Sequence, residues 1–100
     1  MYIFVLSSLS HAQCAVQSSH AVVEIARRGH IPISDPIPNL VLLGIASEAD
    51  LESVAEMLRR LGIIHELFRE PDIGGSLTAI ATVPLGGKLR RHFRKYKLLV

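Results

Sequence analysis

A stripe of uncharged polar side chains runs along one predicted helix near the start of the chain. Gln13, Gln17 and His20 recur at intervals of four and three residues, and Glu24 and Arg27 continue the pattern, so a helix places all five on one face. The first two turns carry no charged residue, although a solvated helix normally carries several there. Amides donate and accept hydrogen bonds, and an imidazole also moves a proton near neutral pH. The stripe therefore predicts a site at the beginning of this helix.

Each residue of the stripe has a chemical and a structural interpretation. His20 is the best candidate for a general base, because imidazole titrates near neutral pH. The alternative is a histidine that is hydrogen-bonded under the sheet. Gln13 and Gln17 can donate amide hydrogen bonds to a carbonyl or an oxyanion. Alternatively, Gln17 orders the neighbouring loop by bonding its backbone.

A turn-rich segment, residues 69–76, supplies two carboxylates that could reach the stripe. Glu70 or Asp72 can orient His20 or a water molecule if this loop folds over the helix, whereas an ordinary polar turn is the alternative. Thr78 begins the strand that follows and could turn its hydroxyl toward the site. The alternative is that threonine stands there for its preference for strands.

The charge of the chain is divided unevenly along its length. The net charge is +2, but residues 1–87 hold five Lys or Arg and all nine acids, while residues 88–100 hold six Lys or Arg and no acid. This basic end predicts a polyanionic partner, and a solvated final helix is the alternative. His11, at the edge of the first helix, could also contact phosphate. The predicted phosphate-binding residues are therefore His11, Lys88, Arg90, Arg91, Arg94 and Lys95.

Several other kinds of site are not predicted. Cys14 and His20 are six residues apart and point roughly 120° away from each other on a helix, which argues against a nucleophilic pair. The spacing of His11, Cys14 and His20 is not that of a zinc site, and no P-loop or dinucleotide fingerprint occurs. We therefore expect neither a metal nor a cofactor. A single cysteine allows no internal disulfide and fits a reducing compartment, so we expect a cytoplasmic protein.

The elements that must position these residues form one predicted α/β domain over residues 1–100. Apolar runs predict strands at 2–6, 39–45, 63–68 and 77–83, and a fifth short strand at 98–100 is an option. Helices follow Ser10, Ser47 and the 84–87 break, and the prolines in 30–38 predict an extended loop. The order β-α-β-α-β-β-α(-β) predicts a three-layer α/β/α fold with a mixed sheet of four strands, or five. We interpret the first residues as a buried strand, not a signal peptide, and expect no membrane partner.

Three segments resemble one family. AVQSSHA (15–21) resembles the A-A-Q-x-x-H-A helix of the archaeal and eukaryotic type (type 2) of peptidyl-tRNA hydrolase, and the leucine-striped helix at 48–61 with its following strand is similar too. SLTAIATVP (76–84), followed by the terminal HFRKYKLL, resembles the last strand and ending of that family. The shortened segment between the third and fourth strands is most similar to the divergent peptidyl-tRNA hydrolase domain-containing branch. Gln13 stands where the standard enzymes have a lysine, and Glu70 stands nearest to their loop aspartate.

The resemblance implies a specific activity and partner. It implies hydrolysis of the ester between a peptide, or another acyl group, and the 3′ end of tRNA, in translation. The expected catalytic residues are Gln13, Gln17, His20, Glu70 and Thr78, and the expected partner is peptidyl-tRNA. The sequence does not decide between a monomer and a homodimer. Because the family lysine and loop aspartate are not matched, a non-catalytic RNA-binding module is the alternative. A small-molecule or protein-interaction domain on the same scaffold is a third hypothesis.

Overall fold

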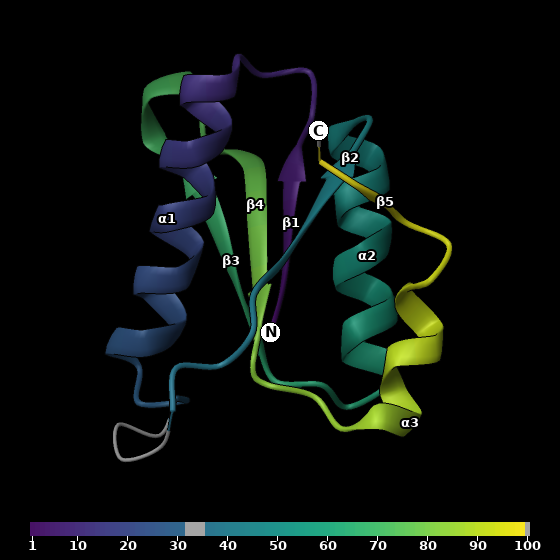
Figure 1. The fold of residues 1–100 in the computed structure, drawn as a ribbon. Helices are drawn as coiled ribbons and strands as arrows, with labels where there is room; N and C mark the ends of the chain where they lie inside the picture. Colours follow the sequence, from purple (N-terminus) through teal and green to yellow (C-terminus); the bar gives the residue numbers. More distant parts are fainter. Residues whose placement is uncertain (32–35, 100) are drawn as a thin grey trace.

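The computed structural model describes residues 1–31 and 36–99 as an α/β fold (Figure 1). Two long helices and a short one accompany five strands, in the order predicted from the sequence. The elements are β1 (Tyr2–Leu6), α1 (His11–Arg27), β2 (Val41–Ile45), α2 (Glu48–Arg60), β3 (His65–Glu70), η1 (Pro71–Ile73), β4 (Ser76–Thr82), α3 (Gly87–Arg90), η2 (Arg91–Phe93) and β5 (Lys97–Leu98). Part of the loop predicted at 30–38, including Pro32, lies outside the described residues, as does Val100 of the predicted last strand.

The five strands form one mixed sheet in the spatial order β3-β4-β1-β2-β5. Strands β1 and β2 are parallel, whereas β4 is antiparallel to both β1 and β3, and β5 is antiparallel to β2. The carboxyl ends of β1, β2 and β3 therefore meet at one edge of the sheet, which we call the carboxyl edge. The starts of α1 and α2 and the β3–β4 connection lie at this edge.

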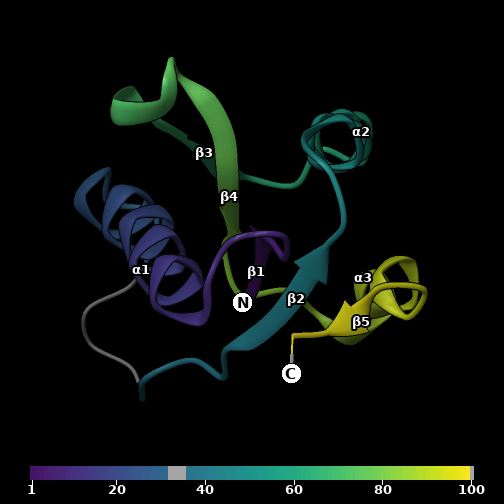
Figure 2. The ribbon, with the colours of Figure 1, turned by 90° about the horizontal axis from the view of Figure 1, so that it is seen from above.

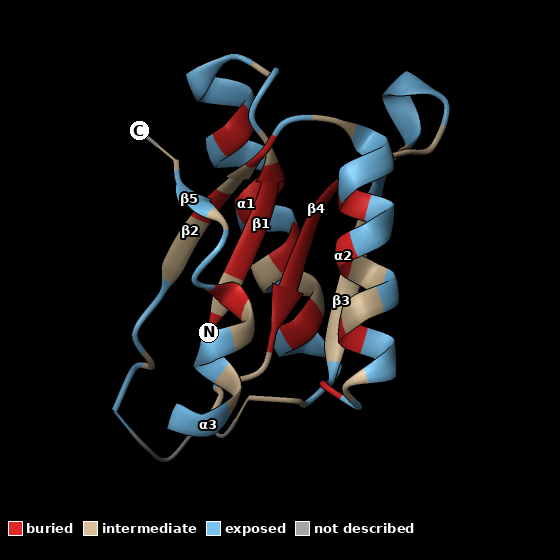
Figure 3. Ribbon diagram, turned by 90° about the vertical axis from the view of Figure 1, so that its right-hand side faces the viewer, coloured by how far each residue is buried: buried red, intermediate tan, exposed pale blue. Residues whose placement is uncertain are grey.

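Helices cover both faces of the sheet and create two cores (Figures 1 and 2). Helix α1 packs over β4, β3 and β1 through residues such as Cys14, Ala21 and Ile25. On the other face, α2 and η2 bury Leu51, Leu58 and Phe93 against the sheet. Figure 3 shows that the buried residues concentrate in β1 and β4, the two strands covered on both faces. Burial of apolar surface in both layers is the main source of stability for a chain of this size.

Local signals in the sequence explain where the helices begin and end. The side chain of Ser10 accepts a hydrogen bond from the backbone N–H of Gln13, and that of Ser47 accepts one from the backbone N–H of Asp50, so both serines cap helices as predicted. Gly29 and Gly62 follow the two helices with φ values of 77° and 70°. Glycine adopts such backbone angles without a steric penalty, so each glycine ends its helix.

The third strand differs from its prediction in a way that matters for the site. We predicted a strand at 63–68 and a loop from residue 69, but β3 runs from His65 to Glu70. A shift of register between Phe68 and Arg69 lets pairing with β4 continue to Glu70 and Ser76. β3 lies at the edge of the sheet, where charged side chains can reach solvent, so Arg69 and Glu70 do not end it. Glu70 is thus the last residue of a strand.

No helix within the described residues is long and apolar enough to cross a lipid bilayer.

Candidate functional site

The side chain of Gln17, on the side of α1 that faces the sheet, bonds both Thr78 of β4 and the carboxylate of Glu70. Its Nε2 donates a hydrogen bond of 2.8 Å to Oε2 of Glu70. Its Oε1 accepts a hydrogen bond of 2.6 Å from the hydroxyl of Thr78. Gln17 is only 8% exposed, because this part of α1 packs directly over β3 and β4. Both ends of the amide are therefore occupied, and its orientation is fixed.

Glu70 is held at the carboxyl edge by bonds from two directions. Besides the Gln17 amide, the backbone N–H of Asp72 donates to the other carboxylate oxygen at 3.3 Å. The hydrogen bond from Gln17, the bond from Asp72 and the nearby His20 all lower the pKa of Glu70 below its usual value of 4.5. Glu70 is consequently a fixed negative charge at neutral pH.

The ring of His20 lies on the exposed side of the same arrangement. It stacks on the ring of Phe68, with the centroids 4.4 Å apart and the planes at 7°. This contact sets the plane of the imidazole, while its edge stays accessible to solvent. The alternative of a histidine buried under the sheet is therefore wrong for His20.

Gln13 reaches the same region but is also used to begin the helix. Its Oε1 accepts a 3.0 Å hydrogen bond from the backbone N–H of Ser10, while its own N–H donates to the Ser10 hydroxyl at 3.1 Å. This reciprocal pair is a capping box. The Oε1 atom is thereby fixed, whereas Nε2 of the Gln13 side chain donates to no described residue.

The predicted residues line one open hollow of about 300 Å³ between the start of α1 and the β3–β4 connection. Its lining residues are Leu9, Gln13, Val16, Gln17, His20, Glu70, Asp72 and Ile73. Four of the five expected catalytic residues therefore converge, three from α1 and one from β3. Thr78 is fully buried and does not line the hollow; its hydroxyl bonds Gln17, which does.

The connection that forms one wall of this hollow is held from both faces of the sheet. On the α1 face, Glu70 is bonded by Gln17. On the α2 face, the carboxylate of Glu48 accepts a 2.9 Å hydrogen bond from the backbone N–H of Leu77, at the start of β4. Between them, Gly74 and Gly75 have φ values of 73° and 79°, which residues with a side chain rarely adopt. The wall is thus a short, anchored turn.

The structure separates most of the predicted phosphate-binding residues from this hollow. Lys88, Arg90 and Arg91 are exposed on α3 and η2, on the α2 face of the sheet, where the chain leaves β4 at the end opposite the carboxyl edge (Figure 1). Arg94 follows them, also exposed. Lys95 lies back near the carboxyl end of β2, in a hollow that it shares with Gly44 and Lys97. His11 is exposed at the first turn of α1.

Sequence reasoning missed several residues that shape the hollow. Phe68 supports His20, Val16 and Ile73 form its apolar rim, and Glu48 anchors its wall from the far face. Val16 and Ile73 are both about half exposed, although both are apolar. The signal available in the sequence was an apolar residue beside the polar stripe and another within the turn-rich segment 69–76. No group of three or more His, Cys, Asp or Glu side chains among residues 1–31 and 36–99 is arranged to hold a metal ion.

Cys14 is buried in the sheet-facing side of α1, away from these groups. Its thiol donates to the carbonyl oxygen of Leu6 at 3.5 Å, and burial raises its pKa. A raised pKa keeps the thiol protonated and unreactive at neutral pH. Cys14 is therefore a core residue.

The chain was also compared with known proteins. No protein-family model matches it, and a search of curated proteins gives no match either.

Proposed function

We propose that this chain is a peptidyl-tRNA hydrolase-like enzyme, which hydrolyses the ester between a peptide, or another acyl group, and the 3′ end of tRNA. The sequence resemblance at 15–21 and 76–84 supports the proposal, since it includes Gln17, His20 and Thr78. The observation that carries it furthest is the Gln17 amide. This amide joins the Glu70 carboxylate to Thr78 directly beside an open hollow that also exposes His20.

The proposed reaction uses His20 as the general base. His20 takes a proton from a water molecule, whose oxygen attacks the ester carbonyl carbon. The tetrahedral intermediate then collapses, the bond from this carbon to the ribose oxygen breaks, and the protonated His20 returns the proton to that oxygen. The ionised Glu70 stabilises the transient positive charge on the imidazole. An ester is already activated, so this modest set of groups suffices.

The remaining groups in the proposal bind or position. The amide nitrogen of Gln13 donates a hydrogen bond to the developing oxyanion, because its Oε1 is fixed in the capping box. Gln17 and Thr78 are positioning residues, since they hold the Glu70 carboxylate and do not reach the reacting atoms themselves. No cofactor takes part in the proposed reaction.

The direct test measures release of tRNA from a labelled peptidyl-tRNA. We expect turnover by the wild-type chain and a fall of about 100-fold or more in kcat for His20→Ala, which is the size of effect that loss of a general base produces. Gln17→Ala should reduce kcat less, because Glu70 remains. His65→Ala is the matched control, since His65 lies at the other end of the same strand as Glu70. Absence of turnover by the wild-type chain would refute catalysis.

A non-catalytic RNA-binding module remains the second candidate, and one observation favours it. The exposed cations of α3 and η2 form no ion pair with any described residue, and they lie on the face of the sheet away from the hollow. RNA held there would not need a reactive centre. This candidate predicts tRNA binding that weakens steeply with salt, without hydrolysis by the wild-type chain or by the His20→Ala variant.

A further inference from the structure

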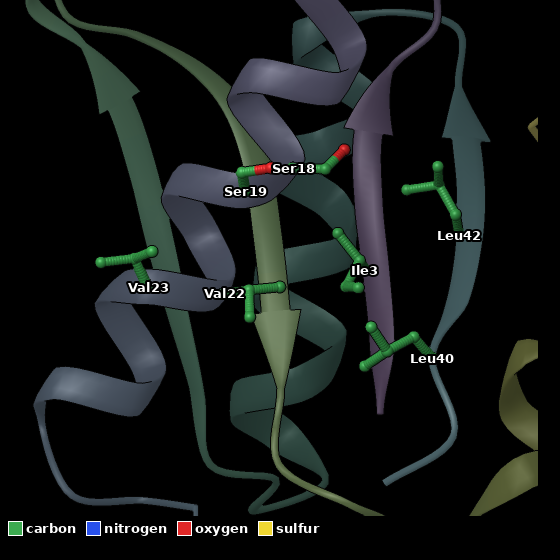
Figure 4. Close-up of a pocket in the computed structure, with 7 residues that line it drawn as sticks. All are labelled: Ile3, Ser18, Ser19, Val22, Val23, Leu40 and Leu42. Atoms are coloured by element: carbon green, nitrogen blue, oxygen red, sulfur yellow. The ribbon is translucent and has the colours of Figure 1, made fainter. Parts of the chain in front are cut away.

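An apolar groove lies beside α1 on the face of the sheet that this helix only partly covers. Helix α1 packs over β4, β3 and β1, and no helix of the described residues lies over β2 on this face (Figure 2). The groove has a volume of about 420 Å³, which is in the range of sites for small ligands. Figure 4 shows the side chains that line it: Ile3, Ser18, Ser19, Val22, Val23, Leu40 and Leu42.

The groove is exposed as well as apolar. Val23 is 60% exposed and Leu40 is 54% exposed, although both are large aliphatic residues. Within residues 1–31 and 36–99, no Lys, Arg, Asp or Glu lines it. A hollow with such an apolar lining suits an apolar group of a ligand.

The groove is continuous with the proposed catalytic hollow. A second shallow hollow, on the outer surface of α1, is lined by Ala15, Val16, Ser19, His20 and Val23. It shares Val16 and His20 with the catalytic hollow, and Ser19 and Val23 with the groove. The three hollows together make one track across α1, from Glu70 to Leu42.

We infer that this track binds the peptide part of the substrate, with apolar side chains of the peptide in the groove; the inference rests on the proposed function. The ester would lie at His20, and the peptide would run past Val16 and Val23 toward Leu40. Val16 and Val23 are seven residues apart, or about 10 Å along the helix, and about three extended residues span that length. Apolar side chains two or three residues before the ester therefore reach the groove.

Charge favours a peptide over RNA as the occupant. Among the described residues, Glu70 and Asp72 are the only charged ones that line the three hollows, and both are acids that repel phosphate. The exposed cations that would attract RNA are on α3, on η2 and near β5, over the other face and the far edge of the sheet (Figure 1). An uncharged apolar peptide meets neither repulsion nor a desolvated charge in the groove.

The test compares two peptidyl-tRNAs that end in the same glycine. One carries N-acetyl-Phe-Leu-Leu-Gly and the other carries N-acetyl-tetraglycine, so the reacting ester is identical. We expect kcat/KM of the wild-type chain to be about tenfold higher for the apolar peptide, and this ratio to fall to about twofold in the Val23→Ser/Leu40→Ser variant. Ile64→Ser is the matched control, because Ile64 is 52% exposed and lies outside the track, and it should keep the tenfold ratio.

A binding measurement separates the inference from the proposed function. Addition of N-acetyl-Phe-Leu-Leu-glycinamide, which has no ester, should shift the NMR amide signals of Val22, Val23 and Leu42. Shifts without any turnover would support the track and refute the hydrolase. Turnover with equal kcat/KM for the two substrates, or shifts that miss these residues, would overturn the track. A dimer in sedimentation experiments that Val23→Ser/Leu40→Ser abolishes would also overturn it, since a second copy would then cover the groove.

Discussion

Gln17 is a buried polar residue whose hydrogen bonds connect α1 to β3 and β4. It faces the sheet beside buried residues such as Cys14, Ala21 and Ile25, and an unpaired amide there would cost free energy. Thr78 and Glu70 satisfy its two ends. Because a fully satisfied buried network has one preferred geometry, Gln17 fixes where the Glu70 carboxylate lies.

Replacement of Gln17 by leucine should destabilise the protein. The Thr78 hydroxyl would keep only the carbonyl oxygen of Phe68, at 3.4 Å, so we expect a loss of about 1–3 kcal/mol in the free energy of unfolding. Thr78→Val removes the same bond from the other side. Urea unfolding of both single variants and the double variant should give a coupling energy of about 1 kcal/mol. If the two losses of unfolding free energy were strictly additive, the Gln17–Thr78 hydrogen bond would contribute nothing to stability.

The lowered pKa of Glu70 predicts how its stabilising effect depends on pH. A carboxyl group whose pKa is lower in the folded state stabilises that state above its usual value of 4.5, and the effect is lost as the pH falls through the folded-state pKa. The difference in unfolding free energy between the wild type and Glu70→Gln should therefore be largest near neutral pH and shrink below about pH 4.5. Glu24, whose pKa is lowered to about 2 by Arg27 and Arg28, is present in both proteins, so its contribution cancels from the difference. A difference that is constant from pH 7 to pH 3 would contradict the assignment.

At the scale of elements, the beginning of α1 explains why Gln13 stands in the polar stripe. A capping box needs a residue such as Gln three positions after the capping serine, so this amide has a role that does not depend on catalysis. The sequence pattern alone could not separate the two roles, because both place Gln13 on the same face. The structure assigns its oxygen to the cap.

Ser10→Ala should therefore lower the free energy of unfolding and also make the Gln13 side chain more mobile. We expect a loss of about 1 kcal/mol, which is typical for removal of a capping hydroxyl. Ser47→Ala is the matched control at α2, where the serine accepts a bond from Asp50 but Asp50 returns none among the described residues. Thermal unfolding should give similar losses for the two variants, whereas only Ser10→Ala should lower turnover. Equal turnover in both would remove Gln13 from the proposed mechanism.

Strand β3 shows what the sequence could and could not predict. Apolar runs and the capping serines predicted the order of the elements and the mixed sheet, because these depend on local periodicity and turn chemistry. The predicted end of β3 was wrong, because Arg69, Glu70 and Pro71 look like loop residues. Pairing with β4 extends the strand to Glu70. The stacking of His20 on Phe68 was equally inaccessible, since the two residues are 48 positions apart.

At the scale of the whole molecule, the basic end of the chain divides into two parts. Lys88 and Arg90 lie on α3, which follows the end of β4, whereas Lys97 pairs with Gly44 near the carboxyl end of β2. The next residue, Ile45, accepts hydrogen bonds from the backbone N–H and the hydroxyl of Ser7, and Ser7 leads into the start of α1. Only the second part, with Lys95, therefore lies at the carboxyl edge that also holds the hollow.

Charge-reversal variants should show which of these two parts binds tRNA. We expect Lys95→Glu/Lys97→Glu to weaken tRNA binding and to reduce kcat/KM, and to lower the slope of log K against log salt by about 1.4–1.8, as two lost phosphate contacts would. Lys88→Glu/Arg90→Glu has the same change of charge and should have the smaller effect on kcat/KM. The opposite ranking would place the RNA over α3, away from the hollow.

The hydrogen bond from the backbone N–H of Leu77 to the Glu48 carboxylate affects how readily the hollow opens. Because the β3–β4 connection is bonded to α1 through Glu70 and to α2 through Glu48, its opening would break both hydrogen bonds while the helices keep their places. Its amides should then exchange with deuterated solvent as slowly as those of the surrounding core, which is unusual for a surface turn. In Glu48→Gln the exchange of the Leu77 amide should quicken while that of β1 stays slow. The rigidity of the hollow is thus set by a carboxylate on the far side of the sheet.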